Sequence, residues 1–210
     1  MYRPYHFFCL SSAFPVLLLG LSWCQQQGLP LSAVSDKGIA LPAIRQELLQ
    51  RVEKDQAIRK QMVSGTPDSA VIQTLRRVDK ENREWLAPLV DQHGWLGASQ
   101  VGQDGAHAAW LLVQHADQDP GFQRTCLDLM SRFSADEVNL KNVAYLTDRV
   151  LLAEGQAQRF GTQFSMQDGQ LTMQPCEDPE NLNQRRQAMG MSSIADYRKM
   201  IEEAYKQKSK

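Results

Sequence analysis

The sequence has no excess of charge of either sign. Its 210 residues contain 23 lysines and arginines against 24 aspartates and glutamates, so the formal net charge at pH 7 is −1. A protein that holds a nucleic-acid backbone needs a basic field to neutralise the phosphates. We therefore predict no nucleic-acid partner. No internal repeat is visible either, which argues against a solenoid or propeller architecture.

Motifs that mark familiar enzyme classes are also missing. The glycines of residues 155–163 do not form a phosphate cradle, which needs a different glycine spacing and a following helix. Ser99 and Cys126 are the nucleophiles closest to a histidine-bearing segment, and neither is part of a nucleophile elbow.

A metal site could draw on His107, His115 and Asp117, but their spacing matches no ligand template. We therefore predict no metal and no cofactor. A glycosidase-like pair of carboxylates could consist of Asp117 and Asp148. That alternative stays open, because the sequence does not give the separation that decides it.

Cysteine is scarce, with four in the chain. If the N-terminal segment is removed, Cys126 and Cys176 remain, with Cys24 as a third at the new N-terminus. An oxidising compartment would permit a Cys126–Cys176 disulfide, although the sequence does not show whether the geometry allows one. We expect instead two small, buried apolar side chains.

The chain has one long apolar run, and it lies at the N-terminus. Arg3 is the only charged residue before Asp36, and residues 7–23 are apolar apart from three serines. A positive start followed by an apolar run is typical of a secretory signal peptide. We predict that residues 1–24 are a signal peptide or lipoprotein leader, that residues 25–40 are a tether, and that the protein is exported to the periplasm or cell envelope.

The end of this leader does not show whether the leader is cleaved, replaced by a lipid anchor or retained. Gly20-Leu21-Ser22 offers small residues to signal peptidase, whereas Leu21-Ser22-Trp23-Cys24 resembles a lipobox that would place a lipid on Cys24. Trp23 departs from the small residue expected before such a cysteine. A retained membrane anchor is a third alternative, since the run approaches the ~18 residues of a spanning helix. Contact with a membrane is expected only through this leader or its lipid.

Residues 41–210 are predicted to form one mainly α domain, an orthogonal or irregular helical bundle with a small β-hairpin near residues 163–174. Asp168-Gly169 supplies the turn signal of that hairpin. Asp68 or Ser69 should cap the second helix, and Pro88 should kink it or end it early. We expect helices at 42–62, 69–93, 106–117, 122–133, 134–154, 178–190 and from Ser192 or Ser193 to about residue 206.

The helix predicted at 106–117 is the most informative one. It is almost wholly apolar and carries Gln114, His115 and Asp117 at its C-terminal end. A helix that is apolar on all sides is buried. Its three terminal polar groups should therefore reach the interior or the wall of a cleft.

Polar residues also interrupt the apolar faces of three other helices. They are Asp55 and Arg59 in the first, Asp79 and Asn82 in the second, and Asp148 and Arg149 in the helix at 134–154. Taken alone, Asp55 and Arg59 would be an ordinary surface ion pair. Because buried polar groups must be paired, we expect the whole set to gather around His115 as one mixed-charge network. The alternative is a network that only fixes the register of the helices.

Three motifs resemble those of one bacterial domain family. They are Val-Gln-His-Ala-Asp (113–117), Ala-Tyr-Leu-Thr-Asp-Arg-Val (144–150) and Gly-x-x-Gln-x-Phe-Gly-Thr-Gln (155–163), supported by Gly94-Trp95, Val101-Gly102 and Arg185-Arg186. The resemblance covers roughly residues 45–200. It implies a single intact domain of unknown function and names no substrate. Phe160 replaces an expected tyrosine, which removes a hydroxyl, and Leu96 replaces an expected proline.

These observations predict an exported helical domain that binds or acts on a small polar ligand. The alternative is a non-catalytic envelope module whose partner is another envelope protein; whether the domain is an enzyme stays open. The catalytic candidates are His115, Asp117, Asp148 and Arg149. The ligand-binding candidates are Asp55, Arg59, Asp79, Asn82, Gln114, Gln158 and Gln163.

Overall fold

The computed structural model describes residues 38–63, 68–167 and 170–208. The leader predicted at 1–24, most of the predicted tether and the Asp168-Gly169 turn lie outside the described residues. Among the helices of the described part, none is both long enough and apolar enough to cross a membrane.

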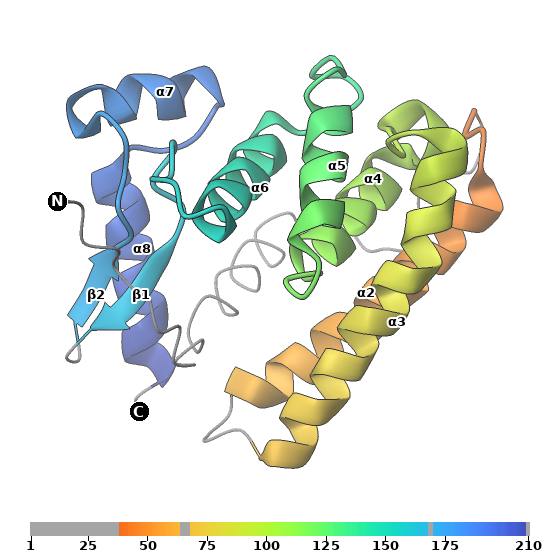
Figure 1. Cartoon of the computed structure of the whole chain (residues 1–210), viewed down its shortest axis with the longest axis horizontal. Coiled ribbons are helices and arrows are strands. Elements are labelled where there is room, and N and C mark those ends of the chain that lie inside the picture. The colour runs from red at the N-terminus through yellow and green to blue at the C-terminus, as the bar shows by residue number, and fades with distance from the viewer. Residues whose placement is uncertain (1–37, 64–67, 168–169, 209–210) are drawn as a thin grey trace, which may run out of the picture.

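Helices make up most of the described chain, and the predicted mainly α fold with one small hairpin is confirmed. The elements are α2 (Pro42–Val63), α3 (Ser69–His93), α4 (Ala98–Gln114), α5 (Pro120–Met130), α6 (Leu140–Ala153), β1 (Phe164–Gln167), β2 (Gln170–Met173), η3 (Pro179–Asn181), α7 (Leu182–Ala188) and α8 (Ile194–Lys208). Figure 1 shows α2 and α3 lying side by side at one end of the molecule and the hairpin with α7 and α8 at the other. Helices α4, α5 and α6 lie between them.

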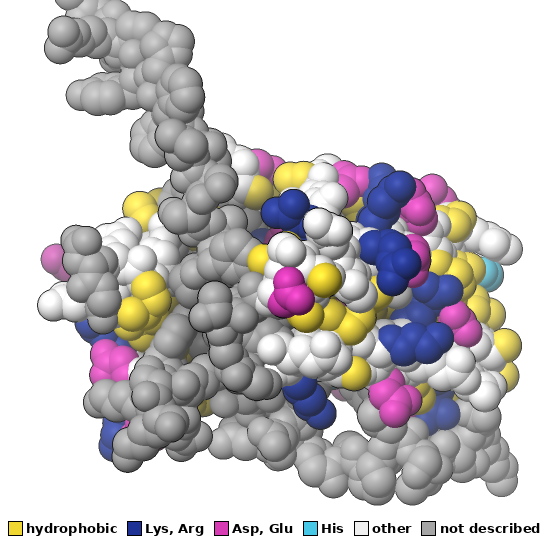
Figure 2. Space-filling view, turned by 90° about the horizontal axis from the view of Figure 1, so that it is seen from below, with side chains coloured by type: hydrophobic (Ala, Val, Ile, Leu, Met, Phe, Trp, Pro, Cys, Tyr) yellow, Lys and Arg dark blue, Asp and Glu magenta, His cyan; other side chains and the backbone are white. Residues whose placement is uncertain are grey.

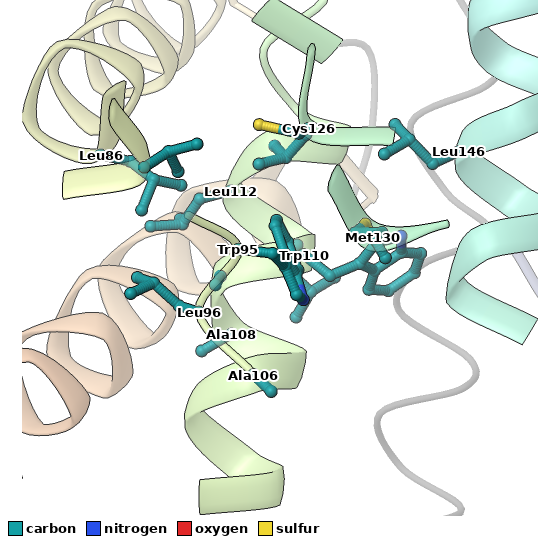
Figure 3. Packing of buried hydrophobic residues seen from close by; sticks show 14 of the residues in the cluster. Leu86, Trp95, Leu96, Ala106, Ala108, Trp110, Leu112, Cys126, Met130 and Leu146 are labelled. Carbon is teal, nitrogen blue, oxygen red and sulfur yellow. The ribbon is translucent and has the colours of Figure 1, made fainter. Parts of the chain in front are cut away.

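Helix α4 is the centre of the main core. It packs against α2, α3, α5 and α6. Its residues from Ala108 to Val113 are all buried, as the apolar pattern predicts. Figure 3 shows the side chains of this core, among them Trp95, Trp110, Leu112 and Met130, gathered around the helix.

Helix α4 begins earlier than predicted, at Ala98 instead of residue 106. Gly102 alone departs from helical geometry, with φ at 74°. A Cβ atom there would lie 3.1 Å from Cδ1 of Ile39 and 3.3 Å from Nε of Arg45. The left-handed conformation and the close approach of the chain before α2 both require glycine at this position.

Helix α6 begins later than predicted. Asn139, and not Ser134, is its N-cap, and the Asn139 side chain accepts a hydrogen bond from the backbone N–H of Lys141. Glu137, expected in the first turn of that helix, instead accepts a hydrogen bond from the backbone N–H of Ser99 at 2.9 Å. The sequence offers two cap residues five positions apart, and the contact with the start of α4 decides between them.

Two other helix ends were predicted with different success. Asp68 caps α3 as expected, since its side chain accepts from the N–H of Ala70. Pro88 does not end α3 early, and the helix continues to His93. Leu86 and Val90 on either side of this proline are buried in the main core, and tertiary packing of this kind outweighs the lost backbone hydrogen bond. The helix predicted at 178–190 is split into η3 and α7.

A second, smaller core lies under the hairpin. Strands β1 and β2 pair antiparallel, with Phe164 opposite Met173. Phe164 and Leu171 pack with Tyr197 and Ile201 of α8. Tyr145 of α6 packs against both cores and so links the two ends of the molecule.

Both described cysteines are free. Cys126 is buried in the main core, as predicted, and burial raises the pKa of its thiol to about 12. Cys176 is partly exposed and its Sγ donates to the carbonyl oxygen of Glu177, so the expected full burial is wrong for this residue.

Candidate functional site

The carboxylate of Asp55 is the hub of a buried polar cluster. Asp55 lies on α2 with none of its surface exposed. Nε of Arg59, one helical turn later, donates to its two oxygens at 3.0 and 3.1 Å, and Nε2 of Gln56 donates to Oδ2 at 2.8 Å. The Asp55–Arg59 pair is therefore not the surface ion pair that the spacing alone favours.

Arg59 joins a second carboxylate to the cluster. Its Nη2 donates to Oδ1 of Asp79, which lies on α3. One guanidinium thus binds carboxylates from two neighbouring helices, while the Arg59 side chain is itself only 3% exposed. Removing Arg59 would leave two buried carboxylates without their shared partner, which is costly.

His115 completes the cluster from α4. It is the C-cap residue of that helix and is 8% exposed. Its Nδ1 lies 3.0 Å from Oδ2 of Asp55. A neutral imidazole that donates from Nδ1 to a carboxylate carries its lone pair on Nε2. Within the described part of the chain, no hydrogen bond engages Nε2.

The pKa values of the carboxyl groups of Asp55 and Asp79 are shifted in opposite directions. Burial raises the pKa of both, but His115, Arg59 and Gln56 more than offset this at Asp55 and lower its pKa to about 2. At Asp79 the burial wins over Arg59, and the negative charges of Asp55 and Asp117 add to it, so its pKa rises to about 7. Two coupled carboxyls that share one guanidinium give one low and one high titration step.

His115 is neutral at pH 7. Burial is the main cause that lowers its pKa from the ordinary value, and the positive charges of Arg59 and Arg149 act in the same direction. The charge of Asp55 opposes them without reversing the shift. The cluster therefore combines a neutral base with a carboxyl that exchanges its proton near neutral pH.

Asp117 and Arg149 form a second pair beside this cluster. Nη1 of Arg149 donates to Oδ1 of Asp117 at 2.6 Å, and Nε2 of Gln123 donates to the same oxygen at 3.2 Å. Desolvation raises the pKa of Asp117, but Arg149 outweighs it and the net shift is downward. Asp117 remains about half exposed, at 52% of its side chain, so this pair lies at the rim.

Asp148 does not join the cluster, contrary to the sequence-based expectation. Both of its oxygens accept backbone hydrogen bonds, from Arg159 and Phe160 on one side and from Thr162 on the other, at 2.7–2.8 Å. An aspartate buried in α6 is well suited to hold a loop in this way, because the loop N–H groups would otherwise be unpaired. With both oxygens so used, Asp148 is poorly placed to act as the acid or base partner of Asp117.

Gln158 and Gln163 belong to this same loop. Oε1 of Gln158 accepts from the backbone N–H of Gln163 at 2.8 Å, and its Nε2 donates to the carbonyl oxygens of Gln163 and Gln174. Nε2 of Gln163 donates to the hydroxyl of Thr162. These contacts are all internal to the hairpin and the loop before it, so the two glutamines stabilise this part of the fold.

Asn82 and Gln114 also lie apart from the Asp55 hub. Oδ1 of Asn82 accepts from Nη1 of Arg51 at 3.3 Å. The backbone carbonyl of Gln114 accepts from Gln123, and Oε1 of its buried side chain has no partner among the described residues. The structure thus gathers Asp55, Arg59, Asp79 and His115, with Asp117 and Arg149 adjacent, out of the predicted set.

Sequence reasoning missed Gln56 and Gln123 as members of this site. Gln56 follows the hub residue directly, and its only signal was its place beside the polar interruption of the α2 face. Gln123 is buried and donates to the backbone carbonyls of Val113 and Gln114 as well as to Asp117. Its position near the start of α5 does not predict that its side chain would bind the backbone at the end of α4.

A different metal-ligand set is present from the one the sequence suggested. Asp55, Asp79 and His115 each offer one ligand atom, and these atoms lie within 4.8 Å of one another. His107 is not part of it, since its Nδ1 contacts Nδ2 of Asn142 at 3.3 Å. The guanidinium of Arg59 already donates to both carboxylates, so a metal ion would bring a second cation close to it. The donor set therefore favours proton chemistry over a metal ion.

The fold and the cluster define a mainly helical protein with a buried network of acid and base groups. The chain belongs to the Family of unknown function (DUF6624), whose model matches residues 42–210. This confirms the resemblance to a domain family without an established activity. Searches of curated proteins and of solved structures found no significant match to the chain.

Proposed function

We propose that Asp55, Asp79 and His115 form an acid–base site that acts on a small polar ligand. The observation that carries the proposal is the contact of Nδ1 of His115 with the fully buried Asp55, which leaves Nε2 available. An imidazole oriented in this way by a carboxylate can accept a proton at Nε2.

Each residue has a distinct role in this proposal. Asp55 is a positioning residue, which fixes the tautomer and orientation of His115 and stabilises the imidazolium that forms. Asp79, with a pKa of about 7, can return a proton to the ligand in the same pH range. Arg59 binds both carboxylates and fixes their positions, and it is not itself a proton donor.

Reaction with diethyl pyrocarbonate tests the availability of Nε2. This reagent acylates neutral imidazole nitrogen, and mass spectrometry of peptides from the folded full chain reports each histidine separately. We expect His115 to be modified, and Asp55→Asn to slow this modification, because the asparagine amide can donate to Nδ1 and move the ring proton to Nε2. Asp68→Asn, at the exposed cap of α3, is the matched control and should leave the rate unchanged.

Protection of His115 in the folded wild type, under conditions that modify the partly exposed His93, would overturn the proposal. The cluster would then be a structural network that fixes α2, α3 and α4 against one another. A His115→Gln variant separates the two alternatives further. A functional site predicts a small change in thermal midpoint, whereas a structural network predicts a large drop.

We also propose that the protein is exported and retained in the cell envelope. The apolar N-terminal run after Arg3 supports this, and residues 1–24 would be the leader. Expression of the full chain in a bacterial host, followed by fractionation and intact-mass measurement, tests it. A mature chain beginning at Cys24 with added lipid supports a lipoprotein, cleavage without lipid supports a simple signal peptide, and an uncleaved cytosolic chain overturns export.

A further inference from the structure

Four buried polar atoms without a hydrogen-bond partner lie on two neighbouring helices. They are Nε1 of Trp110 and Oε1 of Gln114 on α4, and Oδ1 of Asn142 and Nε of Arg149 on α6. Trp110, Gln114 and Asn142 are each at most 5% exposed. A buried polar group that stays unpaired costs about 1–3 kcal/mol, so four in one region need an explanation.

Three contacts show how the two helices are aligned. His107 contacts Asn142 at 3.3 Å, the rings of Trp110 and Tyr145 are 6.2 Å apart, and Asp117 binds Arg149 at 2.6 Å. The residue numbers rise together from pair to pair, so α4 and α6 run in the same direction along this contact.

Gln114 follows Trp110 by one helical turn and therefore lies on the same face of α4. It falls between the Trp110–Tyr145 contact and the Asp117–Arg149 pair. We call the contact between α4 and α6 the α4–α6 seam, and the row is its four residues with unpaired atoms, which follow one another along it in the order Asn142, Trp110, Gln114, Arg149. Donors and acceptors alternate along this row.

The Asn142 amide does not remove the problem by turning over. Its Nδ2 contacts Nδ1 of His107, and the exchange of its oxygen and nitrogen would only place the oxygen there instead. In either orientation one end of the amide has no partner. The partner of the row must therefore be able to both donate and accept.

The seam has a buried floor and an accessible edge. Trp110, Gln114 and Asn142 are buried, whereas Tyr145 and Arg149 are only partly buried. Trp110 lies between the rings of His107, at 5.2 Å, and Tyr145. Aromatic side chains with a few polar groups beside them are typical of the lining of small-molecule sites.

We propose that the α4–α6 seam binds a neutral, hydroxyl-rich ligand, of the sugar or polyol class, along the row of unpaired atoms. Hydroxyl groups both donate and accept, which satisfies the amides and the indole alike, and the C–H faces of a sugar pack well on aromatic rings. A charged ligand is disfavoured because Arg149 already has Asp117 as its counter-charge.

This inference deepens the proposed function, and it rests on that function for the end of the ligand that reacts. Arg149 ends the row and binds Asp117, which follows His115 by two residues, so the ligand would reach the acid–base site at this end. Binding along the seam is measurable without any turnover.

The indole N–H signal of Trp110 tests the proposal directly. In a ¹H–¹⁵N NMR spectrum of the full chain the tryptophan indole signals can be separated, and Trp110→Phe assigns this one. D-glucose and N-acetyl-D-glucosamine are the neutral probes, and D-glucuronate is the charged one. We expect a saturable shift of the Trp110 signal with a neutral probe at millimolar concentration and a weaker response to glucuronate.

Gln114→Leu separates binding from folding. This change removes an unpaired buried amide, so the thermal midpoint should stay or rise, while the affinity for the neutral probe should fall by roughly tenfold, the equivalent of one hydrogen bond. Gln50→Leu, at an exposed position of α2, is the matched control and should alter neither.

The inference would be overturned if the Trp110 signal shifts with neither neutral probe, or if it shifts only with glucuronate. The row would then be satisfied by ordered water only, or the ligand class would be wrong. Either result leaves the test of His115 with diethyl pyrocarbonate independent. Loss of reactivity at His115 with intact probe binding would instead overturn the acid–base proposal alone.

Discussion

Nδ1 of His115 lies 3.0 Å from Oδ2 of Asp55, although sixty positions separate them in the chain. The contact joins the end of α4 to the middle of α2 and brings a neutral base against a fully buried carboxylate. On the face shown in Figure 2, acidic and basic side chains are interspersed.

The Asp55 carboxylate should set the titration of His115. Burial lowers the pKa of His115, and Asp55 is the main group that opposes this shift. We expect Asp55→Asn to lower the pKa of His115 further, as followed by the ring carbon-bound proton signals in NMR spectra recorded against pH. Asp91→Asn, at an exposed position of α3, should leave the titration of His115 unchanged. An unchanged pKa in the Asp55 variant would mean that this carboxylate does not orient the ring.

Asp79 should make the protein less stable as the pH rises from about 4 to 7. Its pKa is raised from 3.8 to about 7 in the folded protein, so the folded state holds a proton that the unfolded state has lost. The contribution of Asp79 to the free energy of unfolding should therefore decrease between about pH 4 and pH 7, by at most about 4 kcal/mol. Asp79→Asn should flatten this decrease in urea unfolding curves measured across that range.

The matched control for this experiment is Asp196→Asn, an exposed change at the start of α8. It should keep the wild-type slope. An equal slope in wild type and the Asp79 variant would show that Asp79 is ionised across the whole range and that Arg59 neutralises it fully.

The hydrogen bonds that Asp148 accepts from the backbone of residues 159–162 should be essential for stability. Asp148→Asn places an amide nitrogen against backbone N–H donors, so at least one of the three hydrogen bonds is lost and a donor is left unpaired. We expect a loss of about 2–4 kcal/mol in the free energy of unfolding, since hydrogen bonds to charged groups are the strong ones. Chemical denaturation measures it. Asp136→Asn, in the exposed turn before α6, should have a negligible effect; a similarly small effect of Asp148→Asn would show that these hydrogen bonds are not needed.

A comparison of two glycines with the same φ angle can distinguish the cost of backbone strain from the cost of steric contact. Gly102 and Gly155 both have φ at 74°, but a Cβ atom at Gly102 would meet Asp104, Ile39 and Arg45, whereas nothing lies within 4 Å of one at Gly155. Each change to alanine should cost about 1–2 kcal/mol from the left-handed backbone. Gly102→Ala should cost more than Gly155→Ala in thermal unfolding, and equal losses would mean that the chain before α2 can move away.

The helical pattern of the sequence was sufficient for most of the fold. Apolar periodicity located α2, α3, α5 and α8 to within a few residues, because an amphipathic face is a property of neighbouring positions. The pattern was insufficient where a tertiary contact determined at which of several suitable residues a helix begins. The start of α6 depended on Glu137 binding the first turn of α4, and the start of α4 depended on a glycine that allows α2 to approach.

The sequence by itself determined that polar groups would be buried, since Asp55, Asp79, His115 and Asp148 all interrupt apolar faces. It could not determine which of them meet. Periodicity gives the face on which a side chain lies, whereas a shared site depends on how far along each helix the faces cross, and that is fixed only by packing. Only the tertiary structure therefore separated His115, which joins Asp55 in a buried cluster, from Asp148, whose carboxylate accepts hydrogen bonds from the backbone of a loop.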